Sequence, residues 1–566
     1  MDQPRALGDT STVRVVDFIV DHLAHAGVRH LFGVGGANIE DLYDAAYFHT
    51  GITAVLAKHE FSAATMADGY GRAGAGLGVV AATSGGASLN LIPGLGESLA
   101  SRVPVLALVG QPPSTQDGRG SFQDTSGRNG SLNAEALFTE VSVRCRRVLS
   151  PDDLRVELPL AVDAARTGGP AVLLIPKDVQ QGRIAAAPVE RIDAHQSATE
   201  LDPITDALGA LDGLVTIIAG EQIARDDARI ELEELRLATG ARVATVPDAK
   251  DVSAADLGVT GVMGHRGVAE AIADSALCLV IGTRLPLTAC AGLDEPLASV
   301  PTFSIGSAVP YPPCRHVHTD DLRASLAQLT RAVRRKSEPR RRELPGQAAK
   351  LTPPPFHGAG VRYGDAMRLL DEVLPEDADL VVDAGNTGAS AIHHLPARRS
   401  GRFVVALGMG GMGYSFGAAI GMAFARDKRR VVVIAGDGAF FMHGMEIHTA
   451  VQYQLPITFV LFNNNAHAMC VTREQLFYQD RYSYNRFAAS FLGRGVASMF
   501  PGLAAEDVDA VELLPQALAR ALAADGPSVV SIECSADEIP PFSPFLAPPQ
   551  PISSTEKDQS NVAART

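Results

Sequence analysis

Short runs of small and β-branched apolar residues alternate along this chain with longer stretches in which apolar residues recur at helical spacing. In residues 12–25 the apolar positions repeat every three or four residues, Ser11 or Thr12 can cap the start, and Gly27 can end the helix. We therefore predict a helix over 12–25 and a buried strand over 28–34. Helices that alternate with short apolar strands favour a parallel sheet covered on both faces.

The same alternation starts again twice, which divides the chain into three α/β units. The first unit covers residues 10–185, the second 195–335 and the third 361–538. Residues 336–360 are rich in proline and charge and predict a linker, and the proline-rich tail 539–566 is expected to wrap a surface or to stay mobile. The predicted strands are 78–83, 103–110 and 171–176 in the first unit, 214–219, 241–246 and 277–282 in the second, and 380–382, 403–406, 430–435 and 457–463 in the third.

Composition indicates a soluble globular protein of 566 residues, 46% hydrophobic and 20% charged. The net charge of -15 argues against a nucleic-acid partner, because phosphate binding needs clustered Lys and Arg. The six cysteines are scattered without a CxxC pair, so neither a zinc site nor a disulfide framework is indicated, and a reducing cytoplasm is expected. No stretch approaches 18 uninterrupted apolar residues, and we expect neither export nor a membrane span.

The third unit carries a candidate metal site directly after a predicted strand. Gly436 and Gly438 flank Asp437 there; the glycines let the backbone approach a phosphate, and the carboxylate suits a hard cation such as Mg²⁺. Asn464 follows Asp437 by 27 residues, after the next predicted strand, and one strand-helix-strand unit returns to the same sheet edge. A tight turn and an ordinary loop would show the same letters. The pairing after two strands favours one shared ion, with a carbonyl near Ala466 as a further ligand.

These two motifs and their interval resemble the signature of thiamine diphosphate-dependent enzymes. The resemblance implies thiamine diphosphate and Mg²⁺ as cofactors, with Asp437, Asn464 and Ala466 as metal ligands. It also implies a fold of three doubly wound parallel-sheet domains, a pyrimidine-binding one, a middle one and a diphosphate-binding one. The sequence has no G-x-x-x-x-G-K-[ST] motif, which argues against a P-loop nucleotide hydrolase. The residues expected to contact the cofactor in this segment are Gly436, Asp437, Gly438, Ala439, Asn464 and Ala466.

Thiamine activation requires a carboxylate that bonds the aminopyrimidine ring and relays a proton. Glu60 is the candidate, because an apolar segment leads into it and small residues follow. An ordinary surface glutamate at a helix start would look similar, but residues 64–71 and 83–85 follow in the family's order. In this family the glutamate and the metal segment come from different subunits. The resemblance thus implies a homodimer or tetramer with active sites between subunits.

Residues 407–417, with the sequence LGMGGMGYSFG, resemble the stretch that holds the cofactor in its bent form. By that match the carbonyl of Gly410 accepts from the pyrimidine amine, and Met412 is the apolar wedge under the bend. A helix that packs on glycines would be compatible with the same residues. Asn386 and Thr387 follow another predicted strand and resemble the loop that donates to the diphosphate.

Two segments resemble the acetohydroxyacid (acetolactate) synthases within this family. Phe122 and Gln123 match the phenylalanine and glutamine loop of these synthases. Met469 and residues 474–483 match their Q-x-L-F-Y-x-x-R-Y-S helix. The resemblance therefore points to carboligation.

The acceptor side of the expected pocket departs from these synthases. Arg473 stands where they carry a tryptophan, Ala468 replaces a glycine, and His467 enters the same loop. Arg284 matches the arginine that would hold the carboxylate of a second substrate, since its planar fork suits an oxoacid; a surface ion pair is the alternative. We expect Arg284 and Arg473 to bind substrate. Residues 261–267 only loosely resemble a flavin loop, which leaves FAD an open question.

The leading hypothesis is a decarboxylating carboligase, in which a pyruvate-like 2-oxoacid loses carbon dioxide and the resulting enamine attacks a carbonyl acceptor. Glu60 would activate the cofactor, and Phe122, Gln123, His467 and Met469 would line the reacting centre. Two alternatives stay open. One is a 2-oxoacid decarboxylase, in which a proton replaces the acceptor, and the other is a catalytically silent subunit that keeps the fold for assembly.

Overall fold

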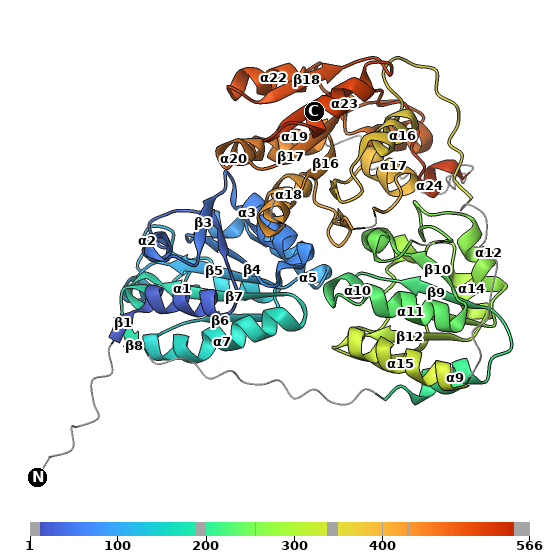
Figure 1. The fold of residues 1–566 in the computed structure, drawn as a ribbon. Coiled ribbons are helices and arrows are strands. Elements are labelled where there is room, and N and C mark those ends of the chain that lie inside the picture. The colour runs from blue at the N-terminus through green and yellow to red at the C-terminus, as the bar shows by residue number, and fades with distance from the viewer. Residues whose placement is uncertain are drawn as a thin grey trace, which may run out of the picture.

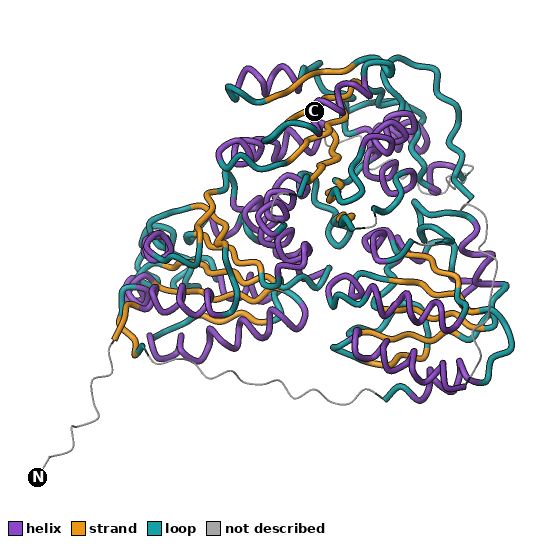
Figure 2. The backbone as a smooth tube through the Cα atoms, viewed as in Figure 1, coloured by secondary structure: helices purple, strands orange, loops and turns teal. Residues whose placement is uncertain are grey.

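The computed structural model describes residues 12–186, 200–254, 256–336, 349–398, 400–426 and 429–547. Three parallel sheets of six, five and six strands lie in three separate lobes (Figure 1). Helices cover both faces of each sheet (Figure 2), so the buried strands can be apolar on both sides. The predicted α/β class with three doubly wound domains is confirmed, while the exact domain boundaries stay predictions.

The N-terminal sheet has the strand order β3-β2-β4-β5-β7-β6. Its two central strands, β4 and β5, are buried along their whole length. The strands are β2 (His30–Val34), β3 (Thr53–Leu56), β4 (Gly78–Ala82), β5 (Val105–Gln111), β6 (Arg144–Arg147) and β7 (Pro170–Pro176), and the helices are α1 (Val15–His25), α2 (Glu40–Phe48), α3 (Glu60–Tyr70), α4 (Gly86–Leu89), α5 (Ile92–Ala100), α6 (Ala134–Thr139), α7 (Pro151–Gly168) and α8 (Lys177–Gln180).

The start of this lobe differs from the prediction of a helix over 12–25. Strand β1 (Thr12–Arg14) pairs antiparallel with β8 (Arg183–Ala185), and α1 begins only after it. The residue before α1 is Arg14, whose side chain makes no capping hydrogen bond. The backbone groups of β1 find partners across the ribbon instead, so a tertiary pairing overrides the local helical spacing.

The middle sheet has the order β10-β9-β11-β12-β13. Its core is a cluster of its own. The strands are β9 (Val215–Ala219), β10 (Arg242–Thr245), β11 (Leu277–Ile281), β12 (Thr302–Gly306) and β13 (Arg315–His318), and the helices are α9 (Asp202–Gly209), α10 (Gln222–Arg225), α11 (Arg229–Thr239), α12 (Gly267–Ala273), α13 (Leu287–Cys290), α14 (Asp294–Ser299) and α15 (Leu322–Lys336).

The C-terminal sheet has the order β15-β14-β16-β17-β19-β18. The described part of the predicted tail ends in a short helix, α24, whose Ser543 donates its N–H to the Val262 carbonyl at 2.7 Å. The strands are β14 (Asp379–Val382), β15 (Phe403–Val405), β16 (Val431–Gly436), β17 (Ile457–Asn463), β18 (Ala504–Val508) and β19 (Ser528–Glu533), and the helices are α16 (Tyr363–Val373), α17 (Asn386–His394), α18 (Tyr414–Ala425), α19 (Asp437–His443), α20 (Ile447–Gln452), α21 (Ala468–Tyr478), α22 (Leu492–Met499), α23 (Leu514–Leu522) and α24 (Ser543–Leu546).

Helices α3 and α18 join the N- and C-terminal lobes through one continuous apolar core. The two helices approach so closely that a Cβ on Gly421 would lie 1.8 Å from the Met66 carbonyl oxygen, and a Cβ on Gly417 would lie 2.1 Å from Thr65 Oγ1. Glycine is required at both positions for this contact. The predicted alternative for residues 407–417, a helix that packs on glycines, therefore holds for the second half of that stretch.

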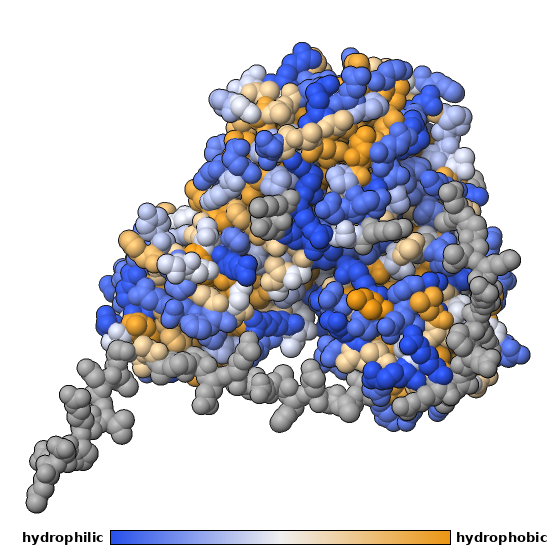
Figure 3. Space-filling model, in the orientation of Figure 1, coloured by the Kyte–Doolittle hydropathy of each residue, from blue (hydrophilic) through white to orange (hydrophobic). Residues whose placement is uncertain are grey.

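The middle lobe is tied to the C-terminal lobe by buried polar contacts. Lys250 donates from Nζ to the carbonyls of Ile392 and Leu395, and burial lowers the pKa of its ammonium to about 7. Asp251 accepts from Arg402 at 2.5 Å. On the face seen in Figure 3, hydrophilic side chains gather near the centre, where the lobes meet. Within the described residues, no helix is long and apolar enough to cross a bilayer.

Candidate functional site

Asp437 occupies the carboxyl end of strand β16, where the backbone turns into helix α19. Its Oδ1 accepts from the Gly438 N–H at 2.9 Å and its Oδ2 accepts from the Ala466 N–H at 3.2 Å. Strands β16 and β17 pair in parallel, which brings the two predicted halves of the metal segment to one sheet edge. Helix α19 begins at Asp437 itself, and a carboxylate is favourable at a helix N-terminus.

The acidic group at this edge is buried, and burial raises the pKa of Asp437 to about 6. Nearby, Asn464 donates from Nδ2 to the Tyr363 hydroxyl at 3.1 Å, while its Oδ1 is buried without a hydrogen-bond partner. A buried carboxylate that resists ionisation and an orphaned amide oxygen both gain from a hard cation. The described residues contain no group of three His, Cys, Asp or Glu side chains placed to hold a metal. A cation here would be held by one carboxylate together with neutral oxygens.

The predicted diphosphate loop lies beside this edge. Gly385 has a φ of +98°, and Asn386 and Thr387 open helix α17 as buried residues. The Oδ1 of Asn386 is buried without a partner. A Cβ on Gly436 would lie 3.8 Å from Thr387 Oγ1, so the polar groups of this loop lie next to the metal segment.

The clamp segment, residues 407–413, follows strand β15 and contains the predicted Gly410 and Met412. Gly410 and Gly413 have positive φ values of +65° and +85°. Asp383 fixes the end of the segment, since its carboxylate accepts from the N–H groups of Gly413 at 3.0 Å and Ser415 at 2.9 Å. Asp383 had no predicted role, although its place at a strand end was an available signal. Burial raises the pKa of this carboxyl.

Glu60 is the first residue of helix α3, and its Oε2 accepts from Asn90 Nδ2 at 2.9 Å. The next residue, Phe61, lies against the clamp segment, because a Cβ on Gly411 would be 3.6 Å from Phe61 Cζ. Its ring also lies 4.3 Å from that of His443 in α19. A single chain therefore brings the start of α3, the clamp segment and α19 together.

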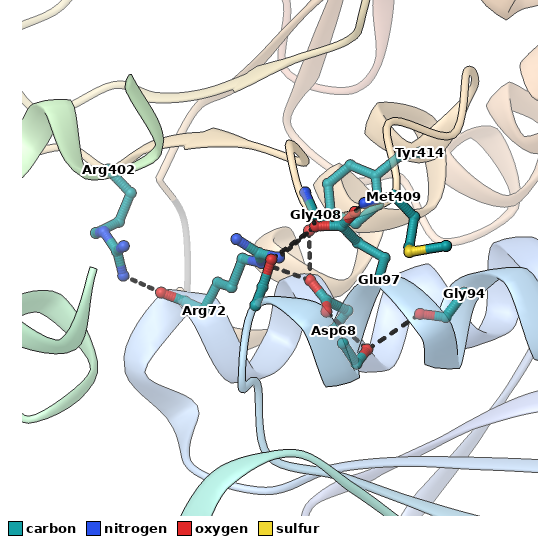
Figure 4. A network of polar contacts seen from close by, with 10 residues as sticks. Asp68, Arg72, Gly94, Glu97, Arg402, Gly408, Met409 and Tyr414 are labelled. Carbon is teal, nitrogen blue, oxygen red and sulfur yellow. Dashed lines mark hydrogen bonds and ion pairs between the residues drawn. The ribbon is translucent and has the colours of Figure 1, made fainter. Parts of the chain in front are cut away.

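A buried network holds the clamp segment from the N-terminal side (Figure 4). Glu97 in α5 accepts from the N–H groups of Gly408 at 3.3 Å and Met409 at 2.6 Å. Arg72 donates to Glu97 at 3.2 Å and to Asp68 at 2.6 Å. All three charged side chains are almost fully buried. Sequence reasoning missed this network, because nothing local distinguishes Glu97 from a surface residue of α5.

A second buried glutamate makes a contact in the opposite direction, from the C-terminal lobe to the backbone of the N-terminal lobe. Glu446 belongs to the C-terminal lobe and accepts the N–H of Lys58, two residues before Glu60, at 3.0 Å. Thr449 donates to the same carboxylate at 2.6 Å. Burial raises the pKa of Glu446. Each outer lobe thus sends one carboxylate to the backbone of the other.

The residues predicted to line the reacting centre are only partly enclosed by one chain. Phe122 is 77% exposed. Gln123 has a φ of +61° and accepts from Ser84 Oγ at 3.3 Å, with its side chain packed beneath Gly85. These positions leave the predicted centre open on the side of Phe122.

The loop after β17 carries the other predicted side chains. His467 packs edge-on against Phe487 at 4.7 Å, with its Nδ1 buried and without a partner, and a Cβ on Gly438 would lie 2.6 Å from that nitrogen. Met469 is half-buried in the first turn of α21. Arg473 is exposed and lies 5.7 Å over the Phe477 ring. His467 therefore faces the metal segment.

Arg284 lies in the middle lobe, stacked 4.3 Å over the Tyr311 ring. Among the described residues it has no carboxylate partner, so the predicted alternative of a surface ion pair is wrong for this part of the chain. It lines a cavity that also reaches Leu407 and Gly408 of the clamp segment.

Both outer lobes match models of a known protein family. Residues 13–130 match the model described as "Thiamine pyrophosphate enzyme, N-terminal TPP binding domain", and residues 383–532 match the corresponding C-terminal TPP binding domain. The chain is a thiamine pyrophosphate enzyme. The predicted resemblance is thus confirmed, and the two matched segments contain Glu60, the clamp segment and Asp437.

Whole-length relatives of this thiamine pyrophosphate enzyme come from several organisms. It is 28% identical to the acetolactate synthase isozyme 2 large subunit of Escherichia coli (strain K12), over 94% of this chain and 97% of that protein. It is 29% identical to the putative acetolactate synthase large subunit IlvB2 of Mycobacterium tuberculosis, over 92% and 97%. It is 26% identical to the probable acetolactate synthase large subunit of Methanocaldococcus jannaschii, over 93% of each chain. These matches, together with the two domains, place it among the enzymes that form carbon–carbon bonds.

The strand ends of the middle sheet are partly occupied by a side chain of the chain itself. Ligands of doubly wound sheets bind at the carboxyl ends of the strands, and Gln222 lies at this edge after β9. It is buried, its Oε1 accepts from the Ser307 N–H at 2.7 Å, and a Cβ on Gly306 would lie 2.8 Å from the same oxygen. The loosely matching segment 261–267 is packed on helix α17, with His265 stacked 4.7 Å from His393. Whether FAD binds stays an open question.

Proposed function

We propose that this thiamine pyrophosphate enzyme is a decarboxylating carboligase that joins the two-carbon unit of a pyruvate-like 2-oxoacid to a carbonyl acceptor. The observation that carries the proposal is the metal edge of the C-terminal lobe, where the buried Asp437 carboxylate lies beside an orphaned Asn464 oxygen. The relatives are named as acetolactate synthase subunits, which supports the choice of reaction.

The residues divide the work of holding the cofactor. Asp437, Asn464 and the Ala466 carbonyl would hold Mg²⁺, and Gly436, Gly438 and Ala439 would contact the diphosphate through their backbone. Bound thiamine diphosphate supplies a carbon nucleophile and an electron sink for decarboxylation. Asn386 and Thr387 would add donors to the diphosphate. The metal assignment uses the orphaned Oδ1 of Asn464. Asn386 would donate to the diphosphate through its Nδ2 or its backbone N–H, because its orphaned Oδ1 can only accept.

Residues of the N-terminal lobe and of the clamp segment would control proton transfer and the bent conformation of the cofactor. Glu60 would hold a proton at the pyrimidine nitrogen, with Asn90 fixing its orientation at 2.9 Å. Gly410 would accept from the pyrimidine amine through its carbonyl, and Met412 would support the bent cofactor. Phe122, Gln123 and Met469 would exclude water from the reacting carbon.

A 2-oxoacid decarboxylase is a second candidate, and His467 is the observation that favours it. Its buried Nδ1 has no partner, so it can carry a proton to the two-carbon unit in place of an acceptor. Product analysis separates the two candidates: the holoenzyme is incubated with pyruvate alone, with a second oxoacid and with an aldehyde. A hydroxyketone product supports carboligation, whereas acetaldehyde alone under all three conditions contradicts it.

The enzyme is also proposed to work as a homodimer or tetramer in the cytoplasm. Large apolar side chains around the site are exposed in one chain, with Phe122 at 77%, Met409 at 66% and Phe441 at 53%. Such a patch is typical of a surface that a second subunit covers. All six cysteines are free, as a reducing compartment requires. Light scattering would give the subunit number, and activity regained on mixing Glu60→Gln with Asp437→Asn subunits would place the site between them.

A further inference from the structure

A buried tyrosine contacts the proposed metal ligand Asn464. Tyr363 is the first residue of α16, it is only 1% exposed, and its hydroxyl accepts from Asn464 Nδ2 at 3.1 Å. A side-chain amide has an oxygen end and a nitrogen end of nearly the same shape, and only the oxygen can bind a hard cation. Since the hydroxyl holds the nitrogen, Oδ1 is the end left for the metal, and within the described residues it has no hydrogen-bond partner.

The hydroxyl of Tyr363 accepts from the amide because its own proton is used elsewhere. Burial raises the pKa of the neighbouring Cys534 thiol, and a hydrogen bond with Tyr363 opposes that rise. A hydrogen bond lowers the pKa of a thiol when the sulfur is the acceptor, so the hydroxyl donates to Cys534 and keeps its lone pairs for Asn464. Burial also raises the pKa of Tyr363 well above its ordinary value. The hydroxyl therefore keeps its proton at neutral pH.

Strands β17 and β19 and the segment after β19 fix the position of Tyr363. Its ring lies 5.7 Å from that of Phe462 in β17. Its N–H is accepted by the Glu538 carboxylate at 3.0 Å, beyond the end of β19. The Val361 N–H is accepted by the carbonyl of Glu533 in β19 at 2.8 Å. Because β17 also leads into Asn464, the ring and the amide are held on one frame, and a hydroxyl fixed in this way selects one orientation of the amide.

Without this hydroxyl the amide would favour the opposite orientation in the metal-free enzyme. The Asp437 carboxylate accepts from the backbone N–H of Asn464, so it lies close to that residue. A carboxylate attracts the amide nitrogen, which is a donor, and repels the amide oxygen, which is only an acceptor. The nitrogen would then face the carboxylate in place of the cation. The Tyr363 hydroxyl opposes this rotation, because it gives the nitrogen another acceptor.

We propose that Tyr363 is a positioning residue for the metal: it holds the Asn464 amide with its oxygen toward the cation, so that the site is arranged for Mg²⁺ before the ion binds. The inference rests on the proposed function, in which Asp437 and Asn464 hold Mg²⁺, and adds a residue to it. Tyr363 acts only through Asn464 and not on the cation itself. Groups that orient a metal ligand in this way change metal affinity about 10–100-fold.

The first test is a calorimetric titration of Mg²⁺ into enzyme that contains thiamine diphosphate. Tyr363→Phe removes only the hydroxyl and should raise the dissociation constant of Mg²⁺ at least about tenfold. Tyr453→Phe is the matched control, because the Tyr453 hydroxyl belongs to the same lobe and accepts one backbone N–H, from Leu56 at 3.3 Å; this variant should bind Mg²⁺ like the unchanged enzyme. If Tyr363→Phe does not fold, Cys534→Ala serves, since the freed hydroxyl proton turns toward Asn464 and should raise the same constant about threefold.

A second test separates the orientation of the amide from general packing. Asn464→Asp places an oxygen at both ends of the side chain, so the hydroxyl no longer decides which atom faces the cation. Tyr363→Phe should therefore change Mg²⁺ affinity less than about twofold in the Asn464→Asp enzyme, against at least about tenfold in the unchanged background. The proposal is overturned if Tyr363→Phe binds Mg²⁺ like the unchanged enzyme, or if both backgrounds lose affinity by the same factor. An unchanged enzyme that binds no Mg²⁺ overturns the metal assignment itself.

Discussion

The two outer lobes share one strand order but carry different chemistry at their strand ends. Numbered in chain order within each lobe, both sheets run second, first, third, fourth, sixth, fifth. The helices that follow the second strands, α3 and α18, pack on each other, and the buried glutamates that follow the third strands, Glu97 and Glu446, each hold the other lobe's backbone. The shared topology thus builds a nearly symmetric interface.

The chemistry across that interface is not symmetric. The third and fourth strands of the C-terminal lobe lead into Asp437 and Asn464, whereas those of the N-terminal lobe, β4 and β5, lead into Thr83 and Pro112. The N-terminal lobe places its acid after the second strand instead, at Glu60. Topology alone therefore positions the sites, and a few side chains decide which lobe holds a cation and which one relays a proton.

The largest expected effect comes from removing the acid of the C-terminal lobe. Asp437→Asn should lower the Mg²⁺-dependent affinity for thiamine diphosphate at least about 100-fold, because the proposed cation loses its charged ligand. Calorimetric titration measures this loss. Asp379→Asn is the matched control, since Asp379 is buried in the same lobe but pairs with Arg426 at 2.9 Å; it should lower stability and keep cofactor binding. Unchanged affinity in Asp437→Asn would contradict the metal assignment.

The corresponding change in the N-terminal lobe should act on rate rather than on binding. Glu60→Gln should leave thiamine diphosphate affinity within about threefold and slow deuterium exchange at the thiazolium carbon by about 10²–10⁴, the range of general acid–base catalysis. Glu40→Gln is the control, because Glu40 also begins a helix of this lobe but pairs with Lys177 on the surface. Equal exchange rates in Glu60→Gln and Glu40→Gln would contradict the proposed role of Glu60 in activating the cofactor.

Low pH should weaken Mg²⁺ binding at Asp437 in the C-terminal lobe. With the pKa of Asp437 raised to about 6 by burial, Mg²⁺ must displace a proton below that pH. Its affinity should fall about tenfold per pH unit from pH 6 to pH 4. In the metal-free enzyme the stability of the fold changes with pH in the opposite direction, because the folded state binds this proton more tightly than the unfolded state does. The group's contribution of about 3 kcal/mol to stability is present below pH 4 and lost as pH rises to 6. Titrations of the unchanged enzyme and Asp437→Asn at each pH isolate both effects.

The sequence could predict those features that depend on the residue types of a short local segment. Strands such as β16 and β17 are continuous apolar runs, and the Gly-Asp-Gly and Asn motifs after them indicate the metal edge through residue type and interval alone. Glu97 and Glu446 could not be found in this way, because their partners lie on another lobe. The strand at Thr12–Arg14 was missed for a similar reason, since its partner lies far away in sequence, at Arg183–Ala185.

The smallest expected effects test whether the two interface glutamates serve different lobes. Glu97→Gln removes a charge-assisted acceptor from Gly408 and Met409, so the half-saturating concentration of thiamine diphosphate should rise about tenfold with little change in kcat.

Glu446→Gln instead loosens the backbone before Glu60. It should slow thiazolium exchange about tenfold with little change in cofactor affinity, because the acid moves relative to the clamp segment while the metal edge is untouched. Asp251→Asn, which loses a buried carboxylate that pairs with Arg402 and Arg229, is the control for stability alone. If Glu97→Gln and Glu446→Gln change affinity and exchange in the same proportion, or act only on stability like Asp251→Asn, the two contacts serve general cohesion of the lobes. Opposite profiles would mean that each lobe positions the functional group of the other.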